Sequence, residues 1–261
     1  MSIFKKLLNF YINSSIHVAL AVFCLVQITV ISNNLHRINY FSTNVFFGTI
    51  VGYNFLKYFD VLRRKNFDKK KCFSIIVVTC FALFGFLISF FCLNFNIQKC
   101  MLISGLFVFI YPFLRKYGWL KLFLVSFVVT FITVYIPFRT EKWLLINYDI
   151  SLIQRFIIVI SLLIPFEILD SKIDSISMNT LPQKFGIAKT KSLGYFLLIF
   201  YLLLDFCKFN FQNYFLYIDI FVISVISVSI YFSDVKRNKY YTSFWVESIP
   251  VLWWVSLLIF C

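Results

Sequence analysis

Long runs of apolar, uncharged residues are the feature that most constrains this chain. A helix rises about 1.5 Å per residue and the hydrocarbon layer of a bilayer is about 30 Å thick, so about twenty such residues cross it. The hydrophobic core of a single soluble domain could not bury so many apolar runs. The sequence therefore predicts an all-α, polytopic membrane protein in which residues 1–261 form one transmembrane domain. Nine runs are expected to span: residues 14–33, 40–58, 73–95, 100–114, 119–137, 148–169, 192–206, 214–232 and 242–260.

Composition excludes the other common classes of protein. Charged residues make up 14% of the chain, whereas soluble domains carry about 25%. The 7 Gly and 5 Pro are too few for the frequent turns of a β-barrel. Seven Cys are scattered without a C-x-x-C spacing, which favours small apolar side chains over disulfides or metal ligands.

Basic residues predict the orientation of the chain. Of the 25 Lys and Arg, 19 lie before the first run or in alternate connections after it, and six lie on the other side. The positive-inside rule then puts the N-terminus in the cytoplasm and the protein in the inner, cytoplasmic membrane of the cell. Because these loops meet anionic lipid headgroups, the net charge of +14 needs no nucleic acid partner.

Acidic residues are rare, which makes their placement informative. Three of the eleven close the sixth run, and the spacing of Glu167, Asp170 and Asp174 puts them on one face of a helix. Carboxylates this close repel one another, and hard oxygen ligands suit Mg²⁺ shared with substrate phosphates. A plainer interpretation stays open, in which these acids are ordinary helix-end charges neutralised by Lys172 and water.

The residues that follow favour the metal interpretation. The stretch 167–186 resembles the second signature of the UbiA-type intramembrane prenyltransferases, an acid-x-x-Asp-x-x-x-Asp pattern followed by Thr-Leu-Pro and a Gly. The segment between the last acid and the Thr is about one residue shorter than in that pattern. The resemblance implies a bundle of about nine transmembrane helices with a central cavity that opens to the cytoplasmic side. The matching residues are Glu167, Asp170, Asp174, Thr180, Leu181, Pro182 and Gly186.

The first signature of that family, Asn-Asp-x-x-Asp-x-x-x-Asp, is eroded at the end of the second run. Aligning Asn54 with the motif Asn leaves aromatic or aliphatic residues at all three Asp positions. Aligning Asp60 with the middle Asp puts Lys57 and Arg64 at the other two. In either register at most one carboxylate remains, and in the second register bases stand where metal-binding acids are expected.

The resemblance implies a Mg²⁺-dependent transferase that moves a prenyl group from a polyprenyl diphosphate to a hydrophobic acceptor, aromatic or quinone-like. The tail would lie between helices and the diphosphate at the cytoplasmic mouth, where basic residues of the eroded signature replace lost metals as phosphate partners. It implies metal ligands Glu167, Asp170, Asp174 and Asp60; diphosphate-binding residues Asn54, Lys57, Arg63, Arg64 and Lys184; and catalytic residues Asp170, Asp174 and Lys57.

Two other functions stay open. The first is a catalytically inactive UbiA-like protein that binds an isoprenoid or lipid, or serves as an accessory subunit. The second is a small transporter, which polar residues at mid-span would favour, whereas the acidic stripe lies at a span end. Among other polar residues, His17 and Gln27 are interpreted as interhelical hydrogen-bond partners and Arg155 as a snorkelling side chain near the outer face.

Overall fold

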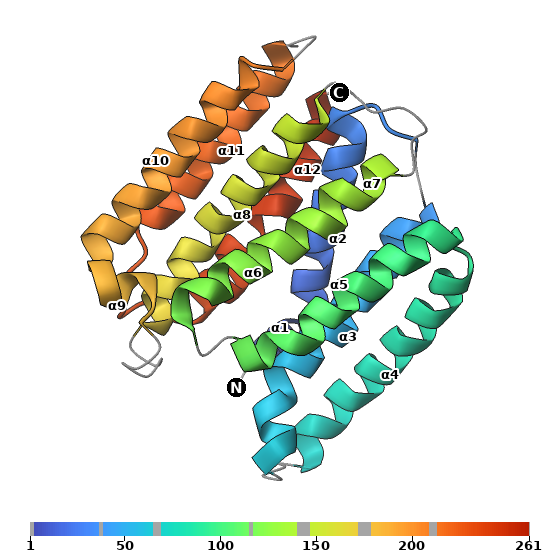
Figure 1. Cartoon of the computed structure of the whole chain (residues 1–261). Coiled ribbons are helices and arrows are strands. Elements are labelled where there is room, and N and C mark those ends of the chain that lie inside the picture. Colours follow the sequence, from blue (N-terminus) through green and yellow to red (C-terminus); the bar gives the residue numbers. More distant parts are fainter. Residues whose placement is uncertain are drawn as a thin grey trace.

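The computed structural model describes residues 3–36, 39–64, 69–114, 117–139, 147–171, 179–208 and 213–260, with the backbone alone for residues 4, 59–64, 69–72 and 213. All regular structure in these ranges is helical, which confirms the predicted class (Figure 1). The elements are α1 (Ile3–Asn13), α2 (Ile16–Ser32), α3 (Asn39–Arg64), α4 (Lys69–Phe91), α5 (Phe95–Leu114), α6 (Gly118–Thr130), the π-helical turn η1 (Phe131–Tyr135), α7 (Ile136–Arg139), α8 (Tyr148–Asp170), α9 (Leu181–Phe185), α10 (Ile187–Asp205), α11 (Asn213–Tyr231), the π-helical turn η3 (Tyr241–Val246) and α12 (Ile249–Phe260).

Each of the nine predicted runs overlaps a helix or a series of consecutive helical segments, as residues 119–137 do on α6, η1 and α7. In the described part of the chain, seven helices are long and apolar enough to cross a membrane, and α1 with α2 reaches that length as a pair bent by 59°. α5 and α10 each begin about a turn before the predicted runs, because basic residues in their first turns lower the hydropathy without ending the helix. The chain is therefore a multi-span membrane protein.

The remaining run corresponds to α3, which is long enough but too polar to be counted among these candidate spans. Two of its buried asparagines donate to α4: Asn44 Nδ2 to the Phe86 carbonyl at 2.9 Å, and Asn54 Nδ2 to Thr79 Oγ1 at 2.8 Å. The side-chain oxygens of both have no hydrogen-bond partner among the described residues. Such interhelical hydrogen bonds contribute about 0.6 kcal/mol on average, and up to about 2, inside a bilayer. Hydrogen bonds from the two buried asparagines therefore help to hold α3 against α4.

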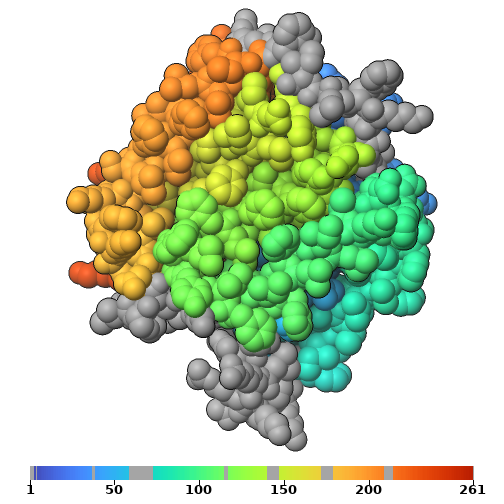
Figure 2. All heavy atoms as spheres, viewed as in Figure 1, coloured from blue at the N-terminus to red at the C-terminus, as the bar shows by residue number. Residues whose placement is uncertain are grey.

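α8 lies at the centre of the bundle. Figure 1 places α10 and α11 on one side of it and α3, α4 and α5 on the other, with α2, α6 and α12 between. Two thirds of its membrane-spanning window is buried, and its isoleucines pack against α11, as Ile164 and Ile168 do near Ile226 and Ile230 in one core cluster. Figure 2 shows the outer surfaces of α5, α6 and α10, whose large apolar side chains are exposed as lipid-facing residues are.

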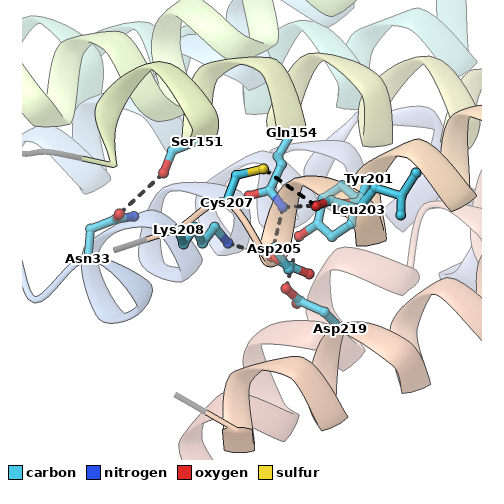
Figure 3. A network of polar contacts seen from close by, with 9 residues as sticks. All are labelled: Asn33, Ser151, Gln154, Tyr201, Leu203, Asp205, Cys207, Lys208 and Asp219. Carbon is cyan, nitrogen blue, oxygen red and sulfur yellow. Dashed lines mark hydrogen bonds and ion pairs between the residues drawn. The ribbon is translucent and has the colours of Figure 1, made fainter. Parts of the chain in front are cut away.

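A polar network fills the end of the bundle where α10 finishes and α11 starts (Figure 3). Asp205 Oδ1 accepts hydrogen bonds from Gln154 Nε2 and Lys208 Nζ, both at 2.7 Å. The Tyr201 hydroxyl donates to Asp219 Oδ2 at 3.2 Å. Gln154 belongs to the second turn of α8, so this network lies about 24 Å along that helix from Asp170, at the opposite end.

The prediction that Arg155 snorkels to the outer face is wrong. The residue is 5% exposed, its Nη2 donates to Thr29 Oγ1 at 2.9 Å, and its guanidinium lies 5.3 Å from the centroid of the Trp253 ring. The hydroxyl and the ring hold the cation between α2, α8 and α12, so it joins these helices inside the bundle.

Candidate functional site

A cavity of about 720 Å³ lies between α2, α3, α5, α6 and α8, as the central cavity of the predicted bundle does. Most of its wall is apolar. Among the described residues that line it, the charged ones are Lys57, Asp170 and Glu247. They come from the second half of α3, the last residue of α8 and the turn before α12. The cavity therefore has one polar end and a long apolar body.

Asp170 is the last residue of α8 and lines this polar end. Helix carbonyls give the C-terminus of a helix a partial negative charge, so an acid in the last turn is unfavourable unless a cation approaches. Asp170 is partly exposed, while Ile168 and Leu169 beside it are buried. The helix end thus presents a carboxylate to the cavity from a rigid, buried turn.

Glu167, one turn earlier, already has a cation. Its Oε1 lies 2.9 Å from Lys121 Nζ of α6, and its side chain is 4% exposed. The described residues contain no group of three or more His, Cys, Asp or Glu side chains placed to hold a metal ion. A metal role for Glu167 would have to compete with this ion pair.

Lys57 lies at the mouth of the cavity. Its Nζ donates to the carbonyls of Ile12 at 3.2 Å and Asn13 at 3.4 Å. Both carbonyls lie in the last turn of α1, beyond the reach of its own N–H groups, and the Ile12 carbonyl also accepts the Ser15 N–H at 3.2 Å. The chain then turns through Ser15, whose φ of 61° is left-handed, and this turn produces the bend between α1 and α2. Lys57 therefore caps the broken helix with an ammonium group that also faces the cavity.

Two other predicted phosphate partners are not brought to the cavity. Asn54 is 3% exposed and its amide is used on Thr79 of α4. Lys184 is exposed on α9, with its Nζ 5.5 Å from the centroid of the Phe185 ring, and neither residue lines the cavity. The side chains of Asp60, Arg63, Arg64 and Asp174 lie outside the described residues, although the α3 backbone continues through the first three.

The Thr-Leu-Pro motif and the Gly that follows it bound a short helix, α9, next to the end of α8. Thr180 precedes α9, Pro182 lies in its first turn, and Gln183 Oε1 accepts from the Thr180 N–H at 3.1 Å. This reach-back and the proline are features of helix N-termini. Gly186 follows with φ 83°, a value that favours glycine, and α10 starts at once. Gln183 Nε2 also donates to the Ser171 carbonyl at 3.3 Å, which fixes α9 to the end of α8.

Glu247 is the functional candidate that the sequence reasoning missed. It lies inside the last apolar run, 242–260, where a lone acid is a signal in its own right because ionisable residues within spans are costly and usually functional. The structure places Glu247 on the cavity wall together with Lys57 and Tyr53.

Comparison with known proteins gives one informative result. No family model matches the chain, and no curated protein matches it. A solved structure of a digeranylgeranylglyceryl phosphate synthase, studied in membranes, matches with a TM-score of 0.61 and covers 98% of this chain and 98% of its own. The two sequences are 15% identical, so the likeness is one of fold: this chain has the helical membrane fold of that synthase along its whole length.

Proposed function

We propose that this protein is a UbiA-type membrane prenyltransferase that moves a prenyl group from a polyprenyl diphosphate to a hydrophobic acceptor. The observation that carries the proposal is the shape and chemistry of the cavity, a mostly apolar chamber with Lys57 and Asp170 at one end. The second-signature residues from Glu167 to Gly186 and the fold shared with a prenyl-lipid synthase support it.

The cavity suits an amphiphile with a long apolar tail. Its lining runs along α3 from Lys57 to Val45, a distance of about 18 Å at 1.5 Å per residue. That length accommodates several isoprene units among Val45, Val108, Val128 and Phe166. The diphosphate then lies at the polar end, which the distribution of Lys and Arg orients towards the cytoplasm.

Lys57 supplies the direct phosphate contact. An ammonium–phosphate hydrogen bond is charge-assisted and stronger than the bonds to neutral carbonyls that Lys57 makes in the free protein. When the allylic C–O bond breaks, its electron pair goes to the diphosphate, and a fixed positive charge there lowers the barrier. The rings of Tyr53 and Phe166 on the wall can face the allylic cation.

Magnesium fits this end of the cavity only in part. The described residues do not form a metal cluster by themselves, and of the predicted ligands among them Asp170 lines the cavity whereas Glu167 is paired with Lys121. We propose Asp170 and Asp174 as the ligands, with Asp60 as a further candidate. Bound there, Mg²⁺ would neutralise charge on the leaving diphosphate.

The alternative, a UbiA-like protein that binds a prenyl lipid without catalysis, is favoured by the eroded first signature, in which basic and apolar residues replace the acids. Purified protein in lipid nanodiscs, tritiated geranylgeranyl diphosphate and Mg²⁺ separate the two. The transferase proposal predicts Mg²⁺-dependent diphosphate release that Asp170→Asn abolishes and the control Lys184→Ala leaves intact. Tight binding without release supports the binder, and absence of binding for every chain length tested refutes both.

A further inference from the structure

We infer that Glu247 is the general base of the site and accepts the proton of a hydroxyl group on the prenyl acceptor. This inference rests on the proposed transferase function and adds the chemical class of the second substrate. When a hydroxyl compound captures the allylic carbon, it loses one proton, and a group in the cavity has to accept it. Asp170 is assigned to the diphosphate, which leaves Glu247 as the second carboxylate among the described lining residues.

The local helix geometry turns Glu247 towards the cavity. The segment before it, η3, is a π-helical turn, and the Glu247 N–H bonds to the Thr242 carbonyl at 3.2 Å, five residues back. The wider turn inserts an extra residue relative to an α-helix and changes the direction of the side chains that follow. Such π turns are rare and occur frequently at functional sites.

A buried histidine holds this turn in place. His17 Nε2 lies 3.0 Å from the Phe244 carbonyl, and since a carbonyl only accepts, Nε2 carries the proton. His17 Nδ1 then accepts from the Tyr11 hydroxyl at 3.0 Å. Ser248 N and Oγ also donate to the Phe244 carbonyl, at 3.0 and 2.6 Å. The start of α2 therefore fixes the π turn, and the carboxylate after it has a defined position.

The Glu247 carboxylate needs a donor. Its Oε2 is buried and has no hydrogen-bond partner among the described residues. A buried acceptor without a partner costs about 1–3 kcal/mol, and more when it is charged. The cavity beside it is wide enough for a substrate, and a hydroxyl group is the neutral donor that completes such a carboxylate. Lys57 on the same wall supplies a compensating positive charge.

The step balances with the groups at hand. The allylic C1–O bond breaks and its electron pair goes to the diphosphate. The acceptor oxygen forms a new bond to C1, and the proton that it loses passes to Glu247 Oε2. The products are a prenyl ether, the diphosphate and protonated Glu247, which returns the proton to water at the cavity mouth. No oxidant or reductant is required.

The test uses two fluorescent probes that differ in one proton donor, 1-naphthol and 1-methoxynaphthalene. Wild-type protein in nanodiscs should bind 1-naphthol at least tenfold more tightly than the methyl ether, and Glu247→Gln should reduce that preference at least fivefold. Asp234→Asn makes the same acid-to-amide change at an exposed position and should leave the preference unaltered. With geranylgeranyl diphosphate present, Glu247→Gln should slow naphthyl ether formation at least 100-fold.

Diphosphate binding separates a base from a mere partner of Lys57. If Glu247 is the base, Glu247→Gln changes the Kd for geranylgeranyl diphosphate with Mg²⁺ by less than about twofold. The inference is overturned if wild-type protein and Glu247→Gln show the same preference between the probes, or if the variant weakens diphosphate binding as much as it weakens naphthol binding. Failure of the proposed function gives a different result: wild-type protein does not bind the diphosphate, but it still prefers 1-naphthol to the methyl ether.

Discussion

The ion pair between Lys121 and Glu167 gives the sharpest test of how the acidic end of α8 is stabilised. Two unit charges 2.9 Å apart attract by about 6 kcal/mol at an effective dielectric constant of about 20, and loss of water around both groups offsets much of this. Removing one partner of such a pair costs about 3–5 kcal/mol, because the other charge stays buried after losing this attraction. Lys121 is 20% exposed, so we expect Lys121→Met to cost about 3 kcal/mol.

Replacing both partners should restore most of the loss. In Lys121→Met/Glu167→Met neither charge remains, and exchanging a buried ion pair for apolar side chains of similar volume is often nearly neutral. Equilibrium unfolding in mixed detergent micelles, followed by circular dichroism, measures the free energy of unfolding of the single and double variants. The reasoning is refuted if Lys121→Met costs less than about 0.5 kcal/mol, or if the double variant is no more stable than the single one.

The same double variant separates a structural Glu167 from a metal ligand. If its carboxylate belongs to Lys121, the double variant keeps Mg²⁺-dependent binding of geranylgeranyl diphosphate within about threefold of wild type. A loss of that binding by tenfold or more would return Glu167 to the predicted metal-ligand set.

Three further changes test other parts of the account. Lys57→Met keeps the apolar stem but removes the ammonium, so affinity for geranylgeranyl diphosphate should fall about 10- to 100-fold, measured by binding titration; an unchanged Kd contradicts the phosphate role. Asp205→Ala removes the carboxylate that accepts from Gln154 and Lys208 and should cost about 1–3 kcal/mol in the unfolding assay; unaltered stability would show that the network contributes nothing. Gly85→Val adds bulk where a Cβ alone would lie 2.7 Å from the Phe47 ring, so it should lower the free energy of unfolding by about 1–3 kcal/mol. The control Gly105→Ala, which has open space around it, should change stability little. Equal effects of the two substitutions would contradict the close packing of α3 and α4.

The spans could be predicted from sequence because hydropathy reports the contact of a helix with lipid. It failed at the edges of α5 and α10, where a basic residue at the membrane surface interrupts the apolar run while the backbone hydrogen bonds continue. For α3 the local pattern was weaker still: Asn44 and Asn54 lower its hydropathy, and only the partner helix α4 shows that both amide nitrogens have acceptors.

The candidate site was predictable only where it is local in sequence. The last turn of α8 and the Thr-Leu-Pro motif lie within twenty residues, so Asp170 could be placed near a cavity in advance. The pairing of Glu167 with Lys121, the capping of α1 by Lys57 and the arrival of Glu247 depend on which helices become neighbours. Asp205 and Asp219 likewise form a network only after α10 and α11 pack together.

A crystal structure of the protein with Mg²⁺ and geranylgeranyl S-thiolodiphosphate, a substrate analogue whose leaving group departs slowly, would show whether the cavity binds a prenyl diphosphate. We expect the isoprenoid tail in the cavity between α2, α3, α5, α6 and α8, a phosphate oxygen within about 3.2 Å of Lys57 Nζ as for an ordinary hydrogen bond, and a metal ion beside Asp170. An analogue bound elsewhere, or a diphosphate that lies away from Lys57 and Asp170, would contradict this expectation.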